Sequence, residues 1–98
     1  MKIEFHPRAQ EEFTEEASYY ERQIPALGIS FISELESAVA LLEEHPKLGA
    51  EFESPFRHLP MCRFPHSLIY AIKPSRIWIV AVAHQKRRPG YWRERIGR

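Results

Sequence analysis

Residues 68–83 read LIYAI, KPSR and IWIVAVA in turn, and this stretch decides the fold of the chain. The runs 68–72 and 77–83 consist of β-branched, aromatic and small apolar residues, which favour β-strands. Pro74 in the connecting segment presets φ for a turn between them. The pattern predicts a β-hairpin, and its almost continuous apolar character predicts that both strands lie in the middle of a sheet.

Two weaker strand patterns lie on the N-terminal side of this hairpin. Residues 56–62 predict a strand in which Pro60, which lacks an N–H, fits best at a sheet edge. Residues 1–5 alternate polar and apolar side chains and predict a short strand that Pro7 ends. The segment 46–55 is predicted to be a connection.

Two amphipathic helices are predicted between these strands, because apolar residues recur there at spacings of three and four. In the first helix these residues are Ala9, Phe13, Ala17, Tyr20 and Ile24. In the second they are Ile32, Leu35, Val39 and Leu42. Pro25 separates the helices, and the second should end near His45 because Pro46 disfavours the α conformation of the residue before it. We expect an antiparallel helical hairpin.

The remaining residues, 84–98, form a short basic tail, in which Tyr91-Trp92 can open a short helix after Pro89-Gly90. The predicted fold class is α+β in two layers. An N-terminal strand and the helical hairpin precede a three-stranded antiparallel meander, in the order β-α-α-β-β-β. With 98 residues and neither a linker nor a repeat, the chain should form one domain over residues 1–98.

Charge is sorted along the chain. Residues 1–56 carry 4 Lys and Arg against 12 Glu, a net charge of 4 − 12 = −8. Residues 57–98 carry 10 against 1, a net charge of 10 − 1 = +9. Such asymmetry is typical of proteins with a polyanionic or acidic partner, and the alternative is a basic face that is simply solvated.

Several kinds of site have no support in the sequence. Four isolated glycines form no phosphate-binding loop, and five histidines with one cysteine show no metal-ligand spacing, so we expect neither a cofactor nor a metal. The chain has no aspartate, which removes the usual magnesium ligands. The lone Cys62 is predicted to be a small buried residue. The longest apolar run, 77–83, is far below the roughly 20 residues that span a bilayer, and we expect a soluble cytoplasmic protein.

The segment 84–95 places cations beside aromatic rings, which suits contact with phosphates and unstacked bases. His84 shares strand parity with Trp78, Val80 and Val82, so it is expected at the rim of a buried face, or else bonded to a local backbone group. Tyr91 and Trp92 have an alternative role in packing the tail onto the sheet.

A metal-free ribonuclease could be built from the same residues. His84 or Tyr91 would exchange protons, and Arg63 and Arg87 would hold the phosphate. The chain would be an enzyme under this hypothesis, whereas a protein that only binds its target would not be one.

Several motifs together resemble the RelE/ParE family of toxins. They are Tyr19-Tyr20-Glu21, Leu27-Gly28-x-x-Phe31-x-x-Glu34-Leu35, Arg63-Phe64-Pro65-His66-x-x-x-Tyr70 and His84-x-x-Arg87-x-Pro89-x-Tyr91-Trp92-x-x-Arg95. The resemblance covers nearly the whole chain. It implies the toxin of a type II toxin–antitoxin module, neutralised by an antitoxin with an acidic, amphipathic C-terminal segment.

The last of these motifs, which begins at His84, looks more like the ParE side of the family than the RelE side. ParE-like members inhibit DNA gyrase, whereas RelE-like members cut messenger RNA on the ribosome. Residues 47–53 also lack the several lysines of RelE-like ribonucleases. The expected gyrase contacts are Lys86, Arg87, Arg88, Tyr91, Trp92, Arg93 and Arg95. Acidic antitoxin side chains are expected at Arg57 and Arg63. The alternatives are a ribosome-dependent endoribonuclease using Arg63, His84, Arg87 or Tyr91, and a degenerate member that only binds antitoxin.

Overall fold

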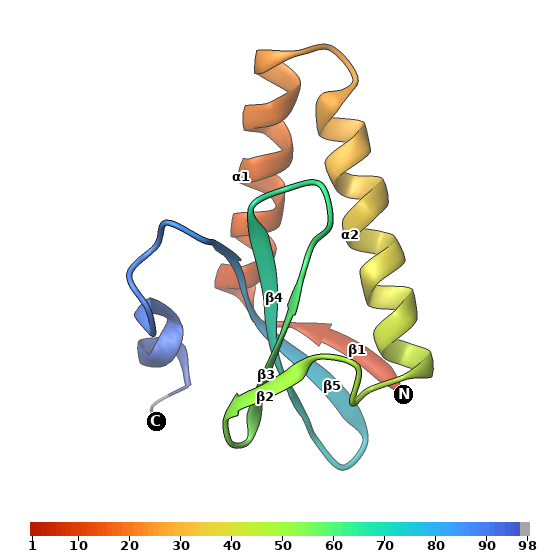
Figure 1. Cartoon of the computed structure of the whole chain (residues 1–98), viewed down its shortest axis with the longest axis vertical. Coiled ribbons are helices and arrows are strands. Elements are labelled where there is room, and N and C mark those ends of the chain that lie inside the picture. Colours follow the sequence, from red (N-terminus) through yellow and green to blue (C-terminus); the bar gives the residue numbers. More distant parts are fainter. Residues whose placement is uncertain (97–98) are drawn as a thin grey trace.

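A computed structural model describes residues 1–96, so the end of the predicted tail, residues 97 and 98, lies outside the described residues. Its elements in chain order are β1 (Lys2–Phe5), α1 (Pro7–Gln23), α2 (Leu27–Glu44), β2 (Ala50–Glu53), β3 (Phe56–Pro60), β4 (His66–Ile72), β5 (Arg76–His84) and the 3₁₀ helix η1 (Tyr91–Arg95). Figure 1 shows the long helical hairpin beside a twisted sheet, with η1 on the opposite side of the molecule. The α+β class and the short helix at Tyr91 are confirmed.

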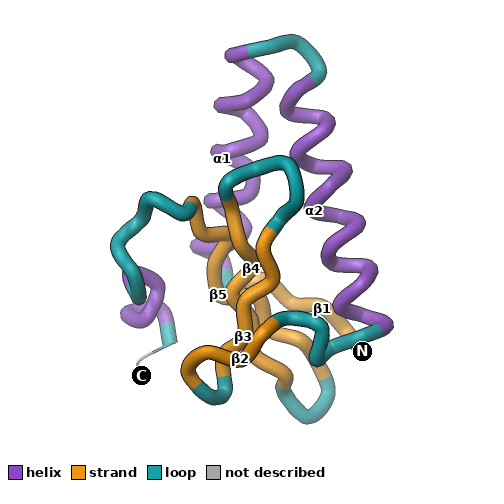
Figure 2. Tube along the Cα trace, in the orientation of Figure 1, coloured by secondary structure: helices purple, strands orange, loops and turns teal. Residues whose placement is uncertain are grey.

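The sheet has five strands in the order β1-β5-β4-β3-β2. β1 pairs with β5 in parallel, and the other neighbouring strands are antiparallel. β4 and β5 lie in the middle, as their apolar sequences predicted, and Figure 2 shows them crossing between the helical hairpin and the tail. β1 pairs only with residues 76–79, so the C-terminal end of β5, from which the tail emerges, is held by its pairing with β4 up to His84.

The predicted three-stranded meander is wrong by one strand. Residues 50–53, predicted to be part of a connection, form β2 and pair with β3, although all four are exposed. Such a strand is held by its backbone pairing and carries no burial pattern that the sequence could reveal. The edge position predicted for Pro60 is wrong as well, since β3 lies between β2 and β4. Proline fits there because β2 pairs only with residues 56–58, which leaves no partner for an N–H at Pro60.

The helical hairpin is confirmed, with α1 ending at Gln23 and α2 at Glu44, one residue before His45. Pro7 occupies the first turn of α1, and the His6 Nδ1 atom accepts a hydrogen bond of 3.0 Å from the Arg8 N–H. At the far end, the Glu21 carboxylate accepts hydrogen bonds of 2.9 Å from the N–H groups of Ala26 and Gly28.

Apolar side chains pack on both faces of the sheet. The larger core lies between the sheet and the helices and contains Ala9, Phe31, Leu35, Leu42, Leu68, Tyr70, Ile77, Ile79 and Val82, among others. The smaller core contains Ile69, Val80, Ala81, Tyr91 and Trp92. The tail therefore covers the sheet face that the helices leave open.

A β-bulge in β5 assigns side chains to these two faces. Ile69 pairs with Ala81 and Tyr70 with Ile79, so Val80 has no partner in β4. The extra residue reverses the alternation of side chains beyond it. Trp78 and Val80 consequently belong to the smaller core and Val82 to the larger one, so the shared parity predicted from Trp78 to His84 is wrong.

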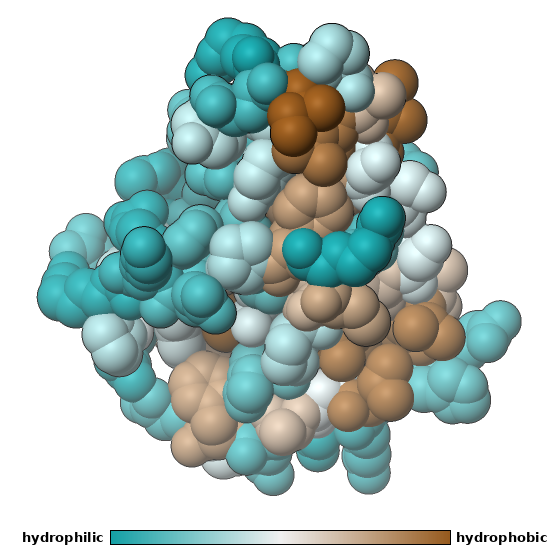
Figure 3. All heavy atoms as spheres, turned by 45° about the horizontal axis from the view of Figure 1, so that its top comes forward, coloured by the Kyte–Doolittle hydropathy of each residue, from teal (hydrophilic) through white to brown (hydrophobic). Residues whose placement is uncertain are grey.

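The surface also differs between the two sides. The side chains of Tyr19, Ile24, Ile29 and Leu41 are apolar and exposed on the helical hairpin. Figure 3 shows such apolar side chains over the hairpin, whereas the side of the molecule that carries the tail is hydrophilic. The hairpin thus carries exposed apolar side chains among its charged residues, whereas the exposed residues of the tail are mainly cations.

Candidate target-binding site

The tail, residues 85–96, leaves β5 and folds back onto the smaller core. Gly90 makes this return possible, because its φ of 77° lies in the left-handed region, which side chains with a Cβ rarely adopt. A Cβ at this position would also overlap the Arg93 guanidinium. The turn places η1 beside the sheet, with Tyr91 9% exposed and Trp92 3% exposed.

Glu12 of α1 holds the tail through a cluster that we call the Glu12 clamp: Glu12, Tyr91 and Arg95. The Tyr91 hydroxyl donates a 2.6 Å hydrogen bond to the Glu12 carboxylate, and Arg95 donates two, of 2.7 and 3.0 Å. The Val82 N–H donates a fourth, of 2.9 Å, and Arg95 also reaches the Val80 carbonyl at 2.9 Å. One carboxylate therefore ties α1, the bulged part of β5 and η1 together.

The clamp sets the protonation of its members. Burial alone would raise the pKa of Glu12, but the hydrogen bonds from Arg95, Tyr91 and Val82 outweigh it, and the pKa is lowered. Burial raises the pKa of the Tyr91 hydroxyl far above its usual value, and the adjacent Glu12 carboxylate raises it further. At neutral pH the clamp is an ion pair beside a neutral tyrosine.

Trp92 provides the apolar half of the attachment. Its ring lies 5.0 Å from that of Phe56 and 6.1 Å from that of Phe52, centroid to centroid. Arg93 forms an ion pair with Glu53 of β2, which fastens the tail to the sheet edge. The packing role considered for Tyr91 and Trp92 is confirmed by their burial.

The predicted target contacts therefore fall into two groups. Tyr91, Trp92 and Arg95 are turned inward and position the tail, and Arg93 is held by Glu53. Lys86, Arg87 and Arg88 are exposed, and no carboxylate within residues 1–96 pairs with them. The Arg87 guanidinium lies 3.8 Å from the centroid of the Tyr91 ring, a cation–π contact that orients it. The three consecutive cations are the accessible part of the site.

His84 stands where the tail begins. Its Nδ1 accepts a 3.0 Å hydrogen bond from the Lys86 N–H, so the predicted bond to a local backbone group is confirmed. The His84 ring lies 4.9 Å from the buried ring of His66. Burial lowers the pKa of His66, Glu16 at 3.2 Å raises it in part, and His84 lowers it again, so His66 stays mainly neutral.

The residues considered for catalysis are only partly brought together. His84, Arg87 and Tyr91 line one groove between the tail and the sheet, with a volume of about 540 Å³. Arg63 does not line it and instead donates to Glu34 of α2 at 3.2 Å. Because the Tyr91 hydroxyl donates to Glu12, it is engaged away from proton exchange in this arrangement. Within residues 1–96 no cluster of His, Cys and Glu could hold a metal ion.

Arg57 and Arg63, predicted to meet the antitoxin, both have partners within the chain. Arg57 donates to the Gly49 carbonyl at 2.8 Å, which secures the approach to β2. Arg63 pairs with Glu34 but keeps 66% of its side chain exposed. Burial raises the pKa of Glu34, but hydrogen bonds from the N–H groups of Arg63 and Cys62 and from the Arg63 side chain lower it overall. The prediction that Cys62 is buried is wrong: its side chain is exposed, and Met61 and Phe64 on either side of it supply the apolar contacts of this loop with the core.

Sequence reasoning gave Glu12 no role and named Glu34 only as part of a family motif. A signal existed for Glu12: it lies between Ala9 and Phe13, one turn after the first and directly before the second, and so borders the apolar stripe of α1. A carboxylate at such a position needs a partner when the helix packs.

Comparisons with known proteins agree with this architecture. The sequence model of the family described as "ParE toxin of type II toxin-antitoxin system, parDE" matches residues 3–89. A solved structure titled "Chromosomal ParDE TA system from P. aeruginosa" matches with a TM-score of 0.75 at 19% identity, over 86% of this chain and 95% of that chain. At this identity the likeness shows the fold. No curated protein sequence matches the chain significantly.

Proposed function

The chain belongs to the ParE toxin family of type II toxin–antitoxin systems, and from this premise we propose that it inhibits DNA gyrase and is neutralised by a cognate antitoxin. The observation that carries the proposal is the run Lys86-Arg87-Arg88, which is exposed on a tail that buried contacts hold in place. Because the backbone of the tail is already fixed, it loses little freedom on binding, which favours a tight complex.

Each part of the tail has a role in this proposal. Lys86, Arg87 and Arg88 contact gyrase directly. Four other residues support binding indirectly by holding these cations in position: Tyr91, Trp92, Arg93 and Arg95. Their side chains are engaged within the chain, in the Glu12 clamp, the smaller core and the ion pair with Glu53.

No helix among residues 1–96 has the length and apolarity needed to cross a bilayer.

The antitoxin is proposed to bind the helical hairpin. A shallow groove crosses it between Ala17 and Ser18 of α1 and Ile29 and Ile32 of α2, beside the close helix contact at Gly28. An amphipathic segment can lay its apolar side chains along such a groove. Its acidic side chains would meet Arg63, which is largely exposed, and Arg57. Charge pairing of this kind speeds association and weakens as salt rises.

Pulse labelling after induction of the chain without its antitoxin tests the target. We expect DNA synthesis to fall before RNA and protein synthesis, and a variant with Lys86, Arg87 and Arg88 changed to Gln to lose this effect. A variant with Lys2, Arg22 and Lys47 changed to Gln loses the same three charges outside the tail and is the control. If protein synthesis stopped first, gyrase inhibition would be contradicted in favour of messenger-RNA cleavage by Arg63, His84, Arg87 or Tyr91.

The antitoxin contact is tested separately by the salt dependence of binding. Arg63→Gln should slow association with the antitoxin, and the difference from the wild type should shrink at high salt. An association rate that is indifferent to both salt and the substitution would contradict the charged contact at Arg63.

A further inference from the structure

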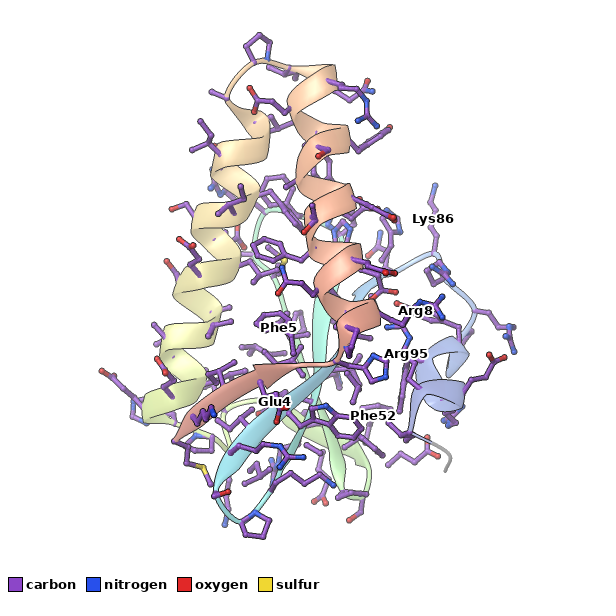
Figure 4. The ribbon with its side chains drawn as sticks, turned by 180° about the vertical axis from the view of Figure 1, so that it is seen from behind. Glu4, Phe5, Arg8, Phe52, Lys86 and Arg95 are labelled. Carbon is purple, nitrogen blue, oxygen red and sulfur yellow. The ribbon has the colours of Figure 1, made fainter. Side chains whose placement is uncertain are left out.

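A second pocket lies between the tail and the start of α1, and it shares Arg87, Arg88 and Tyr91 with the groove on the sheet face. Its volume is about 280 Å³, and its cationic lining comes from Arg8 on the helix and from Arg87, Arg88 and Arg95 on the tail. Figure 4 shows Arg8 and Arg95 directed toward the same region beside the first turn of α1, with Lys86 apart from them near the start of the tail. We call this the α1–tail pocket.

The positive charge of the α1–tail pocket is only partly balanced. Arg95 is neutralised by Glu12. Arg8 has one carboxylate neighbour, Glu11, at 3.6 Å, and the side chains of both are more than 60% exposed, so this pair contributes little. Arg87 and Arg88 have no carboxylate partner within residues 1–96. Glu94 is the one carboxylate among the pocket's lining residues, so cations predominate there.

Two features add to the positive potential and hydrogen-bonding capacity that the guanidinium groups supply. The His6 ring lines it, and because His6 Nδ1 accepts from the Arg8 N–H, the neutral ring carries its proton on Nε2. The pocket also adjoins the N-terminal end of α1, whose dipole adds partial positive charge. These features strengthen an anion site whose main charges are those of Arg8, Arg87 and Arg88.

The shape and chemistry of the pocket favour a phosphate group over other anions. Arginine forks match phosphate oxygens in pairs, and cations on two separate elements can grip one phosphate from both sides. A volume of about 280 Å³ admits a phosphodiester with its sugar but not a helical peptide segment. The lining is mainly charged, which gives an apolar peptide side chain nothing to pack against.

We propose that the α1–tail pocket binds a backbone phosphate of duplex DNA, so that the toxin contacts the DNA held by its target as well as the target protein. The source of that DNA rests on the proposed inhibition of gyrase. Arg8 is the informative residue, because it lies on α1, outside the tail to which the gyrase contacts are assigned.

Binding of a fluorescent duplex by the full-length toxin alone, measured by anisotropy over a range of salt concentrations, tests the proposal. Loss of one phosphate contact should lower the salt slope by about one, so Arg8→Gln should lower it by about one and Arg8→Gln with Arg88→Gln by about two. The double variant should bind roughly tenfold more weakly at moderate salt. Glu94→Gln should bind more tightly, since it removes a repulsive charge.

A variant with Arg22→Gln and Lys47→Gln is the matched control, because it loses the same charge at positions remote from the pocket. Its affinity should stay within about twofold of the wild type. Equal losses in the control and in the Arg8 and Arg88 variant would overturn the proposal in favour of general charge attraction. If inorganic phosphate displaced the duplex at a concentration equal to that of the duplex, the pocket would be a site for free phosphate and the proposal would be overturned.

A third outcome concerns the antitoxin. If Arg8→Gln weakened binding of the antitoxin and left DNA binding intact, the pocket would be a carboxylate site and the proposal would fail. Gyrase is absent from the assay, so DNA binding through the pocket by a toxin that does not inhibit gyrase would contradict the proposed function alone.

Discussion

The Glu12 clamp makes a quantitative prediction. Glu12→Gln keeps the size of the side chain but leaves Arg95 charged without its partner in a site where the two side chains are only 14% and 6% exposed. Removing one member of a buried ion pair costs about 3–5 kcal/mol. We expect the lower end, about 3 kcal/mol, because the amide oxygen of glutamine can still accept the bond from Val82. The amide nitrogen replaces the oxygen that accepts from Tyr91, but it can donate to the Tyr91 hydroxyl instead.

Urea denaturation followed by tryptophan fluorescence measures this loss, since Trp92 belongs to the core that the clamp covers. In a domain of this size, Tm should fall by roughly 12 to 24 °C. Glu15→Gln, on the same helix but exposed, is the control and should change the free energy of unfolding by no more than about 0.5 kcal/mol. A loss below about 1 kcal/mol for Glu12→Gln would refute the clamp as the principal attachment of the tail.

Acid should reveal the same pair. The pKa of Glu12 is lowered from 4.5 in the folded state, so the unfolded chain binds the proton more readily. The stability contributed by the pair is complete above pH 4.5 and is lost as the pH falls through the folded pKa. The difference between wild type and Glu12→Gln should therefore narrow in acid.

Further predictions concern other parts of the fold. The pKa of His66 is lowered from 6.5, and its charged or titratable neighbours are Glu16, Glu12 and His84. The free energy of unfolding should therefore decrease as the pH falls below 6.5. Urea denaturation at several pH values should show a weaker pH dependence for His66→Phe. Gly90→Ala should lower the free energy of unfolding by about 1–2 kcal/mol, because φ is 77° there; a neutral result would show that the tail turns in another way. The Tyr70 hydroxyl donates to the Pro46 carbonyl at 2.7 Å and accepts from the Gly49 N–H at 2.9 Å, so Tyr70→Phe should cost about 1–3 kcal/mol in thermal denaturation, and an unchanged Tm would contradict these bonds.

The sequence predicted those elements whose buried residues form a local pattern, either a periodic stripe or a continuous run. The apolar stripes of α1 and α2 and the continuous runs of β4 and β5 are local patterns, and each element lies where its pattern indicated. β2 has no such pattern, because its four residues are all exposed and its backbone is held by β3. The bulge at Val80 was hidden as well, since an extra residue in one strand is defined only by its partner strand.

The site was predicted less completely than the fold. The cationic run 86–88 could be identified directly from the sequence. The division of labour within the tail could not, because it depends on Glu12, which lies 83 residues before Arg95. A long-range ion pair leaves no periodic trace in the sequence, and Tyr91 and Trp92 suit a binding surface as well as a core until their neighbours are known.

The central claim is that the exposed cations of a clamped tail act on gyrase. A supercoiling assay with purified gyrase and relaxed plasmid tests it most directly. We expect inhibition by the wild-type chain and little or none by a variant with Lys86, Arg87 and Arg88 changed to Gln. The control with Lys2, Arg22 and Lys47 changed to Gln, which loses the same charge, should inhibit fully. Supercoiling that proceeds unaffected by an excess of folded wild-type chain would contradict the claim.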